Sequence, residues 1–496
     1  MSSAHLSWRS RREFIAGGLR AGAALALSSA CAPGSGAGAG SGIDGSSLDR
    51  LRAGFRGDLV VPGDAGYDAA RAVFWKNPLT DRRPGVIARC ADADDVARAI
   101  ELAVERKVPV AVRGGGHSFL GWGTCDDGVV IDTSPMNDIA IDPAGRTARA
   151  GAGIATRDLV AAAVPHGLVP VAGECPGVGL AGFTLGGGLG WLAGTHGAGC
   201  DHLVSVDLVT ADGRRLVASA TEHPELFWAL RGGGGNFGVA TSLTYRLHPL
   251  GIVTAGTMSF PLSDARQVVG AFADLMAAAP DQLQARAVLT RDGQPPAVHI
   301  NICWTGAPAE AGRILQPRRS LGTPLRDTVQ PVASYTDTFA MSGGGVPRMF
   351  TAVKGSYLER LSSETIALIL DHLAQAPGSG AAIGLDHYMH GEVCRVPPDA
   401  AAFELRTPDA VHVWISAGWD APADGPGLSG WIDQTWQALQ GYSAGRVFTN
   451  FPAAEGEAAV RGAYRGNYAR LAAVKRLYDP ANVFQRNHNL RPAPRA

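Results

Sequence analysis

Apolar residues recur at helical spacing in the segment that begins at Asp92. Aspartates stand at the start of this segment and Lys107 lies near its end, as is typical of a helix. An apolar strand over Val108–Val112 follows and runs into the glycines Gly114–Gly116. The pattern predicts an α/β unit whose loop holds a ligand. The residues on the apolar side of the helix are Val96, Ala99, Ile100, Ala103 and Val104.

Short strands and tight turns fill the rest of the first half. Residues 128–153 alternate strands with turns at Ser134-Pro135 and at 143–145. Residues 203–219 predict a hairpin that turns at Asp212-Gly213, and a last alternating strand ends near Pro249. We expect these elements to form one domain over residues 50–250.

The pattern changes after residue 250. Apolar alternation predicts strands at 297–306 and 410–419, and helical spacing predicts a helix at 362–376. An antiparallel sheet covered by helices accounts for residues 251–441, and we expect it to be a domain inserted into the first. Residues 442–496 carry a helix, a turn at Asp479-Pro480 and a polar tail that returns to the first domain. The predicted fold class is α+β.

Composition narrows the class of protein. The chain has 496 residues, a formal net charge of -1 and 46% hydrophobic residues, which describes a globular protein with two or three structural units. It lacks the basic field that nucleic-acid binding requires. We therefore expect a small-molecule partner and no nucleic acid.

The first residues have the layout of an export signal. Arg11-Arg12 precedes a mildly apolar run and small residues, which predicts a twin-arginine signal over 1–32 and use of the twin-arginine export machinery. The run is short and is interrupted by Arg20, so it does not predict a permanent membrane span. A Gly/Ser/Ala-rich linker, predicted to be flexible, follows over 33–49. The expected location is periplasmic or extracellular, and the sequence leaves release and lipid anchoring at Cys31 as alternatives.

The seven cysteines are scattered and form no CxxC pair. This argues against a zinc site and against a disulfide framework, although one or two isolated disulfides remain compatible with the spacing. We expect no metal.

Three glycine-dense segments carry the candidate chemistry. The first is Arg113–Ser118, the second spans 173–190, and the third spans 227–243. Successive glycine amides can curl around a phosphate, but none of the segments has the GxGxxG pattern of a dinucleotide fold followed by an acidic residue. Three such loops predict one long cofactor laid across the domain.

Five segments together resemble the motifs of the berberine bridge enzyme-like oxidases, which have a vanillyl-alcohol-oxidase or PCMH-type FAD-binding domain. They are RGGGHS, GECPGVGLAGFTLGGGLGWL, DLVTADG, HPELFWALRGGGGNFGVATSL and YDPANVFQRNHNL. The resemblance runs over about 57–250 and the last fifty residues. It implies a two-subdomain FAD-binding domain with an inserted substrate domain, and an FAD-linked oxidoreductase.

The resemblance also implies how the cofactor is held. The family's flavin-linking histidine falls on His117 and its linking cysteine on Cys175, which implies a bicovalent FAD. Val178 falls on the position that gates oxygen, where valine favours an oxidase. Other expected cofactor contacts are Arg113, Gly114, Gly115, Gly116, Ser118, Gly179, Gly182, Thr184, Gly187, Gly188, Gly190, Gly238, Val239, Asn487 and Asn489.

The chain departs from the family where a catalytic base is expected. Many members carry Tyr-x-Asn-Tyr near the C-terminus, and this chain reads Phe448-Thr449-Asn450-Phe451. A phenyl ring cannot accept a proton. Because an alcohol needs a base for its O–H proton, we expect amines, phenols or hydroquinone-like natural products to be favoured over sugars.

Replacement bases are predicted in the middle domain. Strand alternation places His412, Trp414 and Ser416 on one face of 411–419. If 385–393 is also a strand, Asp386, Tyr388, His390 and Glu392 share a face. A solvated sheet face would explain both patterns without catalysis. The candidate catalytic residues are His412, Trp414, Glu392, Asp386 and Tyr388.

These observations predict an exported FAD oxidase that transfers hydride from a small organic substrate to flavin and uses dioxygen, with hydrogen peroxide as product. An oligosaccharide or alcohol oxidase with another base is the alternative among enzymes. Among proteins without catalytic activity, the alternative is a flavoprotein that only sequesters a toxic compound.

Overall fold

The computed structural model describes residues 42–291, 296–342, 348–451 and 456–494. The predicted signal over 1–32 and Cys31 lie outside the described residues. The predicted linker is too long, because helix α2 (Gly45–Arg52) begins within it. The Asp44 carboxylate accepts from the Ser47 N–H at the helix start, and Leu51 is buried. Within the described residues, no helix combines the length and apolarity that a membrane crossing needs.

The first sheet confirms the predicted helix and strand. Its parallel strands β2, β4 and β3 lie side by side, and helix α4 packs on them through Val96, Ala99, Ile100 and Ala103 of the predicted apolar side. The prediction was wrong for Val104, which is 45% exposed. The Asp92 carboxylate caps this helix by accepting from the N–H groups of Asp94 and Asp95. The elements are β1 (Asp58–Val60), α3 (Tyr67–Arg71), β2 (Val86–Arg89), α4 (Ala93–Arg106), β3 (Val110–Arg113) and β4 (Val129–Asp132).

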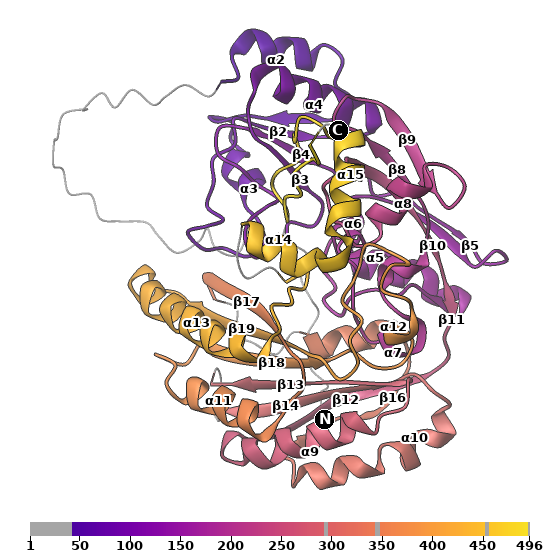
Figure 1. The fold of residues 1–496 in the computed structure, drawn as a ribbon, viewed down its shortest axis with the longest axis vertical. Helices are drawn as coiled ribbons and strands as arrows, with labels where there is room; N and C mark the ends of the chain where they lie inside the picture. Colours follow the sequence, from indigo (N-terminus) through magenta and orange to yellow (C-terminus); the bar gives the residue numbers. More distant parts are fainter. Residues whose placement is uncertain (1–41, 292–295, 343–347, 452–455, 495–496) are drawn as a thin grey trace, which may run out of the picture. The chain divides into compact units, whose positions relative to one another are not determined.

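A second sheet of five strands completes the first domain (Figure 1). All its pairings are antiparallel, and β8 and β9 form the predicted hairpin, in which Gly213 has a φ of +79°. Short helices pack against its core. The strands run in the order β5 (Ile139–Asp142), β6 (Thr147–Gly151), β10 (Val239–Arg246), β8 (Leu203–Val209) and β9 (Arg215–Ser219); nearby are α5 (Thr156–Ala163), α6 (Leu180–Leu185), α8 (Pro224–Leu230), and the pair β7 (Leu168–Val169) and β11 (His248–Pro249).

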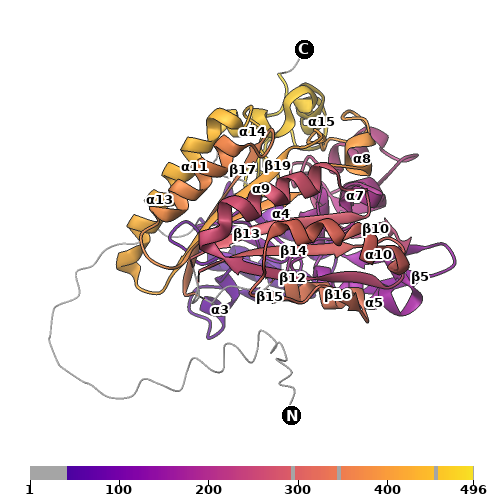
Figure 2. The ribbon, with the colours of Figure 1, turned by 90° about the horizontal axis from the view of Figure 1, so that it is seen from below.

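The middle of the chain forms the predicted antiparallel sheet, here with eight strands. Figures 1 and 2 show its helices gathered along one face. The strands are β15 (Arg326–Asp327), β12 (Val253–Pro261), β14 (Ala297–Trp304), β13 (Leu283–Thr290), β18 (Ala381–His387), β19 (Val411–Trp419) and β17 (Phe350–Leu358), with β16 (Gln330–Val332) also paired to β12; the helices are α9 (Ala265–Ala277), α10 (Pro308–Ile314), α11 (Ser363–Ala374) and α13 (Gly425–Leu439).

Alternation along β19 decides which residues meet the helices. Val411, Val413 and Ile415 lie in the core under helices α9, α11 and α13, so His412 and Trp414 point to the opposite face. We call this opposite face the open face of the sheet.

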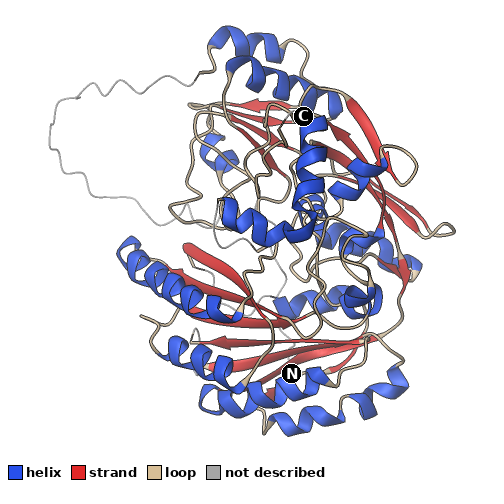
Figure 3. Cartoon of the chain, in the orientation of Figure 1, coloured by secondary structure: helices blue, strands red, loops and turns tan. Residues whose placement is uncertain are grey.

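The last residues pack against the first domain. Helices α14 (Glu457–Tyr464) and α15 (Tyr468–Tyr478) follow the middle domain, and α15 runs beside α8 of the first (Figures 1 and 3). The buried Lys475 ammonium donates to the carbonyls of Asn236 at 2.8 Å and Phe484 at 3.0 Å, which ties this segment to the third glycine loop. Short helices α7 (Ala193–His196) and α12 (Glu392–Arg395) and 3-10 turns at Val164–His166, Gly199–His202, Leu262–Asp264, Gln316–Leu321, Tyr335–Ser342, Pro422–Asp424, Gln440–Tyr442 and Arg465–Asn467 complete the described elements.

Candidate active site

The first two glycine loops meet backbone to backbone. A Cβ on Gly115 would lie 2.3 Å from the Gly179 nitrogen, and a Cβ on Gly179 would lie 2.2 Å from the Gly115 nitrogen. Only glycine permits this approach. Gly116, with a φ of +69°, then turns the chain toward His117.

The meeting of the loops brings the two predicted flavin-linking residues into one region. A Cβ on Gly177 would lie 3.2 Å from His117 Nε2, so the turn that contains Cys175 passes beside the imidazole. The Val178 N–H donates to the Cys175 carbonyl at 3.3 Å and closes that turn. Burial raises the pKa of the Cys175 thiol, while the Gly177 N–H and the charge of Arg286 oppose the rise. All six described cysteines are free thiols.

Several residues predicted to touch the cofactor also pack closely against the protein core. The Thr184 hydroxyl pairs with Tyr245 OH at 3.1 Å in the core. The Val239 side chain is buried among the residues under the first sheet, and a Cβ on Gly238 would meet the Val209 carbonyl at 2.7 Å. A Cβ on Gly190 would meet the Ala172 carbonyl at 2.3 Å. Glycine serves close packing and ligand approach alike, so these contacts with the core leave the predicted cofactor contacts as predictions.

Apart from the two C-terminal asparagines, the remaining residues predicted to contact the cofactor lie within the first two glycine-dense segments. Arg113 donates to Asp132 at 2.8 Å across the ends of β3 and β4, and the Ser118 hydroxyl accepts from the Trp122 N–H at 3.2 Å. Gly182 has open space where a Cβ would be. Gly187 and Gly188 have positive φ angles of +109° and +81° and pack under Phe403 and Phe183.

The C-terminal tail adds polar atoms that fit a long polar cofactor. The Asn487 amide donates to the Gly235 carbonyl at 3.0 Å, which places the tail on the third glycine loop. Its Oδ1 atom and that of Asn489 are buried and have no hydrogen-bond partner among the residues that the structure describes. Buried polar atoms of this kind require a partner. Together with the glycine loops, they fit the FAD that the sequence predicts.

The Phe448–Phe451 segment contacts both the second glycine loop of the first domain and His412 of the middle domain. Asn450 holds it in place, since Oδ1 accepts from the Gly188 N–H at 3.1 Å and Nδ2 donates to the Phe183 carbonyl at 3.1 Å. The ring of Phe451 contacts Phe119 of the first domain at 4.9 Å between centroids. This segment therefore closes the side of the site next to the flavin-linking loops.

The open face of the sheet brings a predicted pair of residues together. His412 Nδ1 lies 2.9 Å from Asp386 Oδ2, and both side chains are almost fully buried. Trp414 Nε1 donates to the other carboxylate oxygen of Asp386 at 3.4 Å. Cross-strand register explains the meeting, because Asp386 on β18 is directly opposite His412 on β19.

Aromatic rings enclose the other side of His412. Ring centroids of Phe451, Phe448 and Tyr357 lie 4.4, 5.3 and 5.4 Å from that of the imidazole. His412 Nε2 is buried and has no hydrogen-bond partner within the described ranges. The arrangement can hold an imidazole with one nitrogen fixed by a carboxylate and the other directed at a ligand.

Two predicted catalytic residues do not join this pair. Strand β18 ends at His387, and Gly391, with a φ of +68°, turns the chain into α12, so the expected common face of 386–392 does not form. Glu392 begins that helix and pairs with Arg395 at 3.0 Å at the surface. Tyr388 is buried but donates its hydroxyl to Glu174 Oε1 at 2.7 Å.

Sequence reasoning missed Glu174 and Arg286. Glu174 precedes Cys175, and its carboxylate forms an ion pair with Arg286 Nη1 on the open face. Burial raises the pKa of Glu174 to about 7, although the Arg286 charge opposes the rise. A charged residue directly before the predicted flavin-linking cysteine was the available signal.

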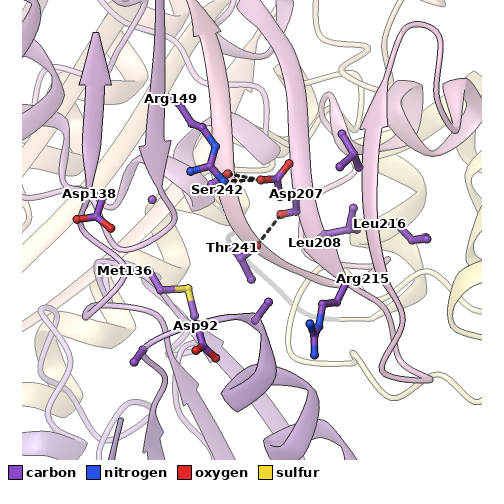
Figure 4. A pocket seen from close by; sticks show the side chains of 14 residues that line it. Asp92, Met136, Asp138, Arg149, Asp207, Leu208, Arg215, Leu216, Thr241 and Ser242 are labelled. Carbon is purple, nitrogen blue, oxygen red and sulfur yellow. Dashed lines mark hydrogen bonds and ion pairs between the residues drawn. The ribbon is translucent and has the colours of Figure 1, made fainter. Parts of the chain in front are cut away.

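A separate cavity of about 450 Å³ lies between the two sheets of the first domain. Figure 4 shows Asp92, Arg149 and Asp207 around it, with Arg149 directed at Asp207. None of the predicted site residues lines it. It is therefore distinct from the site built by His117, Cys175 and His412.

Comparisons with known proteins agree with this architecture. The family described as "FAD binding domain" matches residues 84–219, and the family described as "Berberine and berberine like" matches residues 447–491. The (R)-6-hydroxynicotine oxidase of Paenarthrobacter nicotinovorans is 33% identical over 457 residues, which cover 88% of this chain and 97% of that protein.

Solved structures have the same fold. The crystal structure of 6-hydroxy-D-nicotine oxidase from Arthrobacter nicotinovorans matches with a TM-score of 0.79 and 30% identity, covering 88% of this chain and 98% of that one. Glucooligosaccharide oxidase from Acremonium strictum, which has a 6-S-cysteinyl, 8α-N1-histidyl FAD, matches with a TM-score of 0.79 and 21% identity over 91% of this chain and 100% of that one. The chain therefore belongs to the berberine bridge enzyme-like family, with a PCMH-type FAD-binding domain, and is an FAD-dependent oxidase.

Proposed function

We propose that the protein is an exported oxidase that dehydrogenates a small amine, phenol or hydroquinone-like natural product. His117 and Cys175 would hold FAD, and the bound FAD would supply a hydride acceptor for the substrate that dioxygen can reoxidise, with hydrogen peroxide as product. Export rests on the twin-arginine pattern of 1–32, and the use of dioxygen is supported by Val178.

The observation that carries the proposal is the His412–Asp386 pair. The Asp386 carboxylate faces Nδ1 at 2.9 Å, so it holds the proton on that nitrogen and leaves the lone pair on Nε2. Nε2 then takes the O–H or N–H proton of the substrate as hydride departs. His412 thus supplies the base that Phe448 and Phe451 cannot.

The walls of the site favour an aromatic or apolar substrate over a sugar. Phe448, Phe451 and Tyr357 present rings around His412. A sugar ring carries several hydroxyls that each need a polar partner on burial, whereas a phenol or amine needs one. The 33% identical relative is named for hydroxynicotine, in which a hydroxylated heteroaromatic ring carries a saturated cyclic amine.

Covalent attachment is supported by the two loops. The Cys175 turn passes beside His117, because a Cβ on Gly177 would lie 3.2 Å from His117 Nε2. Acid precipitation of the purified protein tests attachment directly, because covalent flavin stays yellow in the pellet. A colourless pellet with flavin in the supernatant excludes it.

A peroxide-coupled screen of aromatic amines, hydroquinones and oligosaccharides tests the substrate class, and His412→Ala tests the base. With the best substrate we expect kcat to fall by about 10²–10⁴ in His412→Ala, with flavin content unchanged. Asp386→Asn should lower kcat through a wrong imidazole tautomer.

His299 offers a matched control on the same open face. Its Nδ1 pairs with the Ser259 hydroxyl at 2.9 Å, away from Asp386. His299→Ala should keep full turnover. Unchanged turnover in His412→Ala contradicts the base assignment, and a signal with oligosaccharides alone contradicts the substrate class. Tight ligand binding without flavin bleaching would instead indicate sequestration.

A further inference from the structure

The buried ion pair between Arg286 and Glu174 joins the two domains next to Cys175. Arg286 lies on β13 with its side chain 13% exposed, and Glu174 lies on the cysteine loop with its side chain 5% exposed. Arg286 Nη2 also donates to the Met341 carbonyl at 3.0 Å. The guanidinium is therefore fixed from both sides.

The loop itself is fixed by three contacts from the middle domain. Arg286 and Tyr388 donate to the two oxygens of the Glu174 carboxylate. The Ser342 hydroxyl donates to the Glu174 backbone carbonyl at 2.6 Å. Because Cys175 is the next residue, these contacts set the position of its Cα and the direction of its side chain.

Arg286 also acts on the thiol electrostatically. Burial disfavours the Cys175 thiolate by raising its pKa, and the Glu174 carboxylate adds to this rise, whereas the Arg286 charge and the N–H groups of Gly177 and Val178 oppose it. The thiolate is the nucleophilic form of cysteine. A buried cation beside a buried thiol therefore favours the form that can make a bond.

We propose that Arg286 and Glu174 are positioning residues for the bond between Cys175 and the flavin. Arg286 stabilises the Cys175 thiolate, and Glu174 holds both Arg286 and the cysteine loop in place. This inference rests on the proposed bicovalent cofactor and assigns roles that the resemblance does not include.

The bond formation balances with dioxygen as oxidant. The Cys175 S–H bond and the C6–H bond of the flavin break, and an Sγ–C6 bond forms. The two electrons released pass through the flavin to dioxygen, which takes up two protons and becomes hydrogen peroxide. Oxygen consumption in the absence of substrate should therefore accompany attachment.

The test measures attachment at each residue separately. Full-length chain produced without flavin is mixed with FAD in air, sampled over time, digested, and analysed by peptide mass. In wild type one flavin should join the His117 and Cys175 peptides. In Arg286→Met, which removes the cation, we expect flavin on the His117 peptide, with formation of the Cys175 bond slowed about tenfold or more. In Glu174→Ala we expect a similar slowing because the loop loses its side-chain contacts with Arg286 and Tyr388, although the Glu174 charge that raises the pKa of Cys175 is also removed.

The pH dependence separates the electrostatic role from a structural one. The rate of Cys175 bond formation should rise with pH as the thiol ionises. In Arg286→Met this rise should move to higher pH, and Arg286→Lys should restore it in part because the charge returns. An equal slowing at every pH would overturn the proposed action on the thiolate.

A control removes another buried ion pair in the same protein. Arg406 donates to Asp201 at 2.7 Å with its side chain 2% exposed, and Arg406→Met should lose stability but keep the Cys175 bond rate. If Arg286→Met and Glu174→Ala form the bond at the wild-type rate, the inference is wrong while the bicovalent cofactor stands. If wild type carries flavin on His117 alone, the bicovalent cofactor itself fails.

Discussion

The imidazole of His117 lies flat against the ring of Phe74, with 3.9 Å between ring centroids and 17° between the planes. Phe74 is 52% exposed, so burial of its own apolar surface does not account for its position against the imidazole. A stacked ring restricts rotation of the imidazole about its side-chain bonds. Phe74 therefore orients His117 next to the Cys175 loop.

Replacing Phe74 with alanine should slow attachment of flavin to His117. Stacking is worth about 0.5–1.5 kcal/mol, which corresponds to roughly two- to tenfold in rate. Peptide mass analysis after mixing with FAD measures it, with Leu79→Ala as the control, because Leu79 is similarly exposed at 58%. Equal rates for both variants would show that the stack does not orient the imidazole.

Gly179→Ala should destabilise the fold and abolish flavin binding. The added Cβ would lie 2.2 Å from the Gly115 nitrogen, and the two loops would have to separate. We expect a loss of at least about 1–3 kcal/mol in the free energy of unfolding and a colourless protein. Gly270→Ala in α9 has open space and should gain about 0.5–1 kcal/mol and stay yellow. Urea unfolding and the visible absorption spectrum report both.

Lys475→Met should lower the free energy of unfolding far more than removal of a lysine at the protein surface. Lys475 Nζ pairs with Asp479 at 2.6 Å with both side chains fully buried, and removing the cation leaves a buried carboxylate. A loss of about 3–5 kcal/mol is expected. Lys354→Met removes a pair with the largely exposed Asp433 and should cost less than about 1 kcal/mol. Similar midpoints of urea unfolding for the two variants would contradict this prediction.

Acid should destabilise the protein through a cluster of three histidines. His248 Nε2 lies 2.8 Å from His202 Nδ1, and His196 stacks on His248 at 3.9 Å. Burial lowers the pKa of His202 to about 4 and that of His248 to about 3 from 6.5. Between about pH 6.5 and 4 the unfolded chain binds more protons than the folded chain, so stability is lost as pH falls through this window.

Thermal unfolding across pH measures the effect of the histidine cluster. His248→Phe keeps a ring on His196 and removes one half-buried histidine with a lowered pKa, so the fall in Tm between pH 6.5 and 4 should become shallower. The exposed His166 serves as control, and His166→Phe should keep the wild-type slope. A steeper fall in His248→Phe would count against the assignment.

Local pattern was enough to predict much of the fold. The helix over 93–106, the hairpin at Asp212-Gly213 and the direction of His412 follow from periods of 3.6 and 2 residues, which burial enforces. The same period misled at 386–392, where alternating polar residues resemble a strand. Gly391, in the left-handed region, ends that pattern and sends Glu392 to the surface.

The partners of each site residue were harder to predict. Asp386 meets His412 through strand register, and Arg286 meets Glu174 across 112 positions of sequence. Neither pairing can be read from local alternation, because strand register and the docking of the two domains depend on the whole sheet. Resemblance to a family located His117 and Cys175, but it is silent about Glu174 and Arg286.

Residues from the end of the chain hold two of the glycine loops of the first domain in place. Asn450 fastens the second glycine loop, and Lys475 and Asn487 fasten the third. A nascent chain synthesised only to residue 250 contains the three glycine loops but lacks the residues that hold the second and third loops in place. Cofactor capture is thus expected only after the ribosome has released the chain, so flavin colour would report on complete synthesis, and proteins shortened before Asn450 should remain colourless.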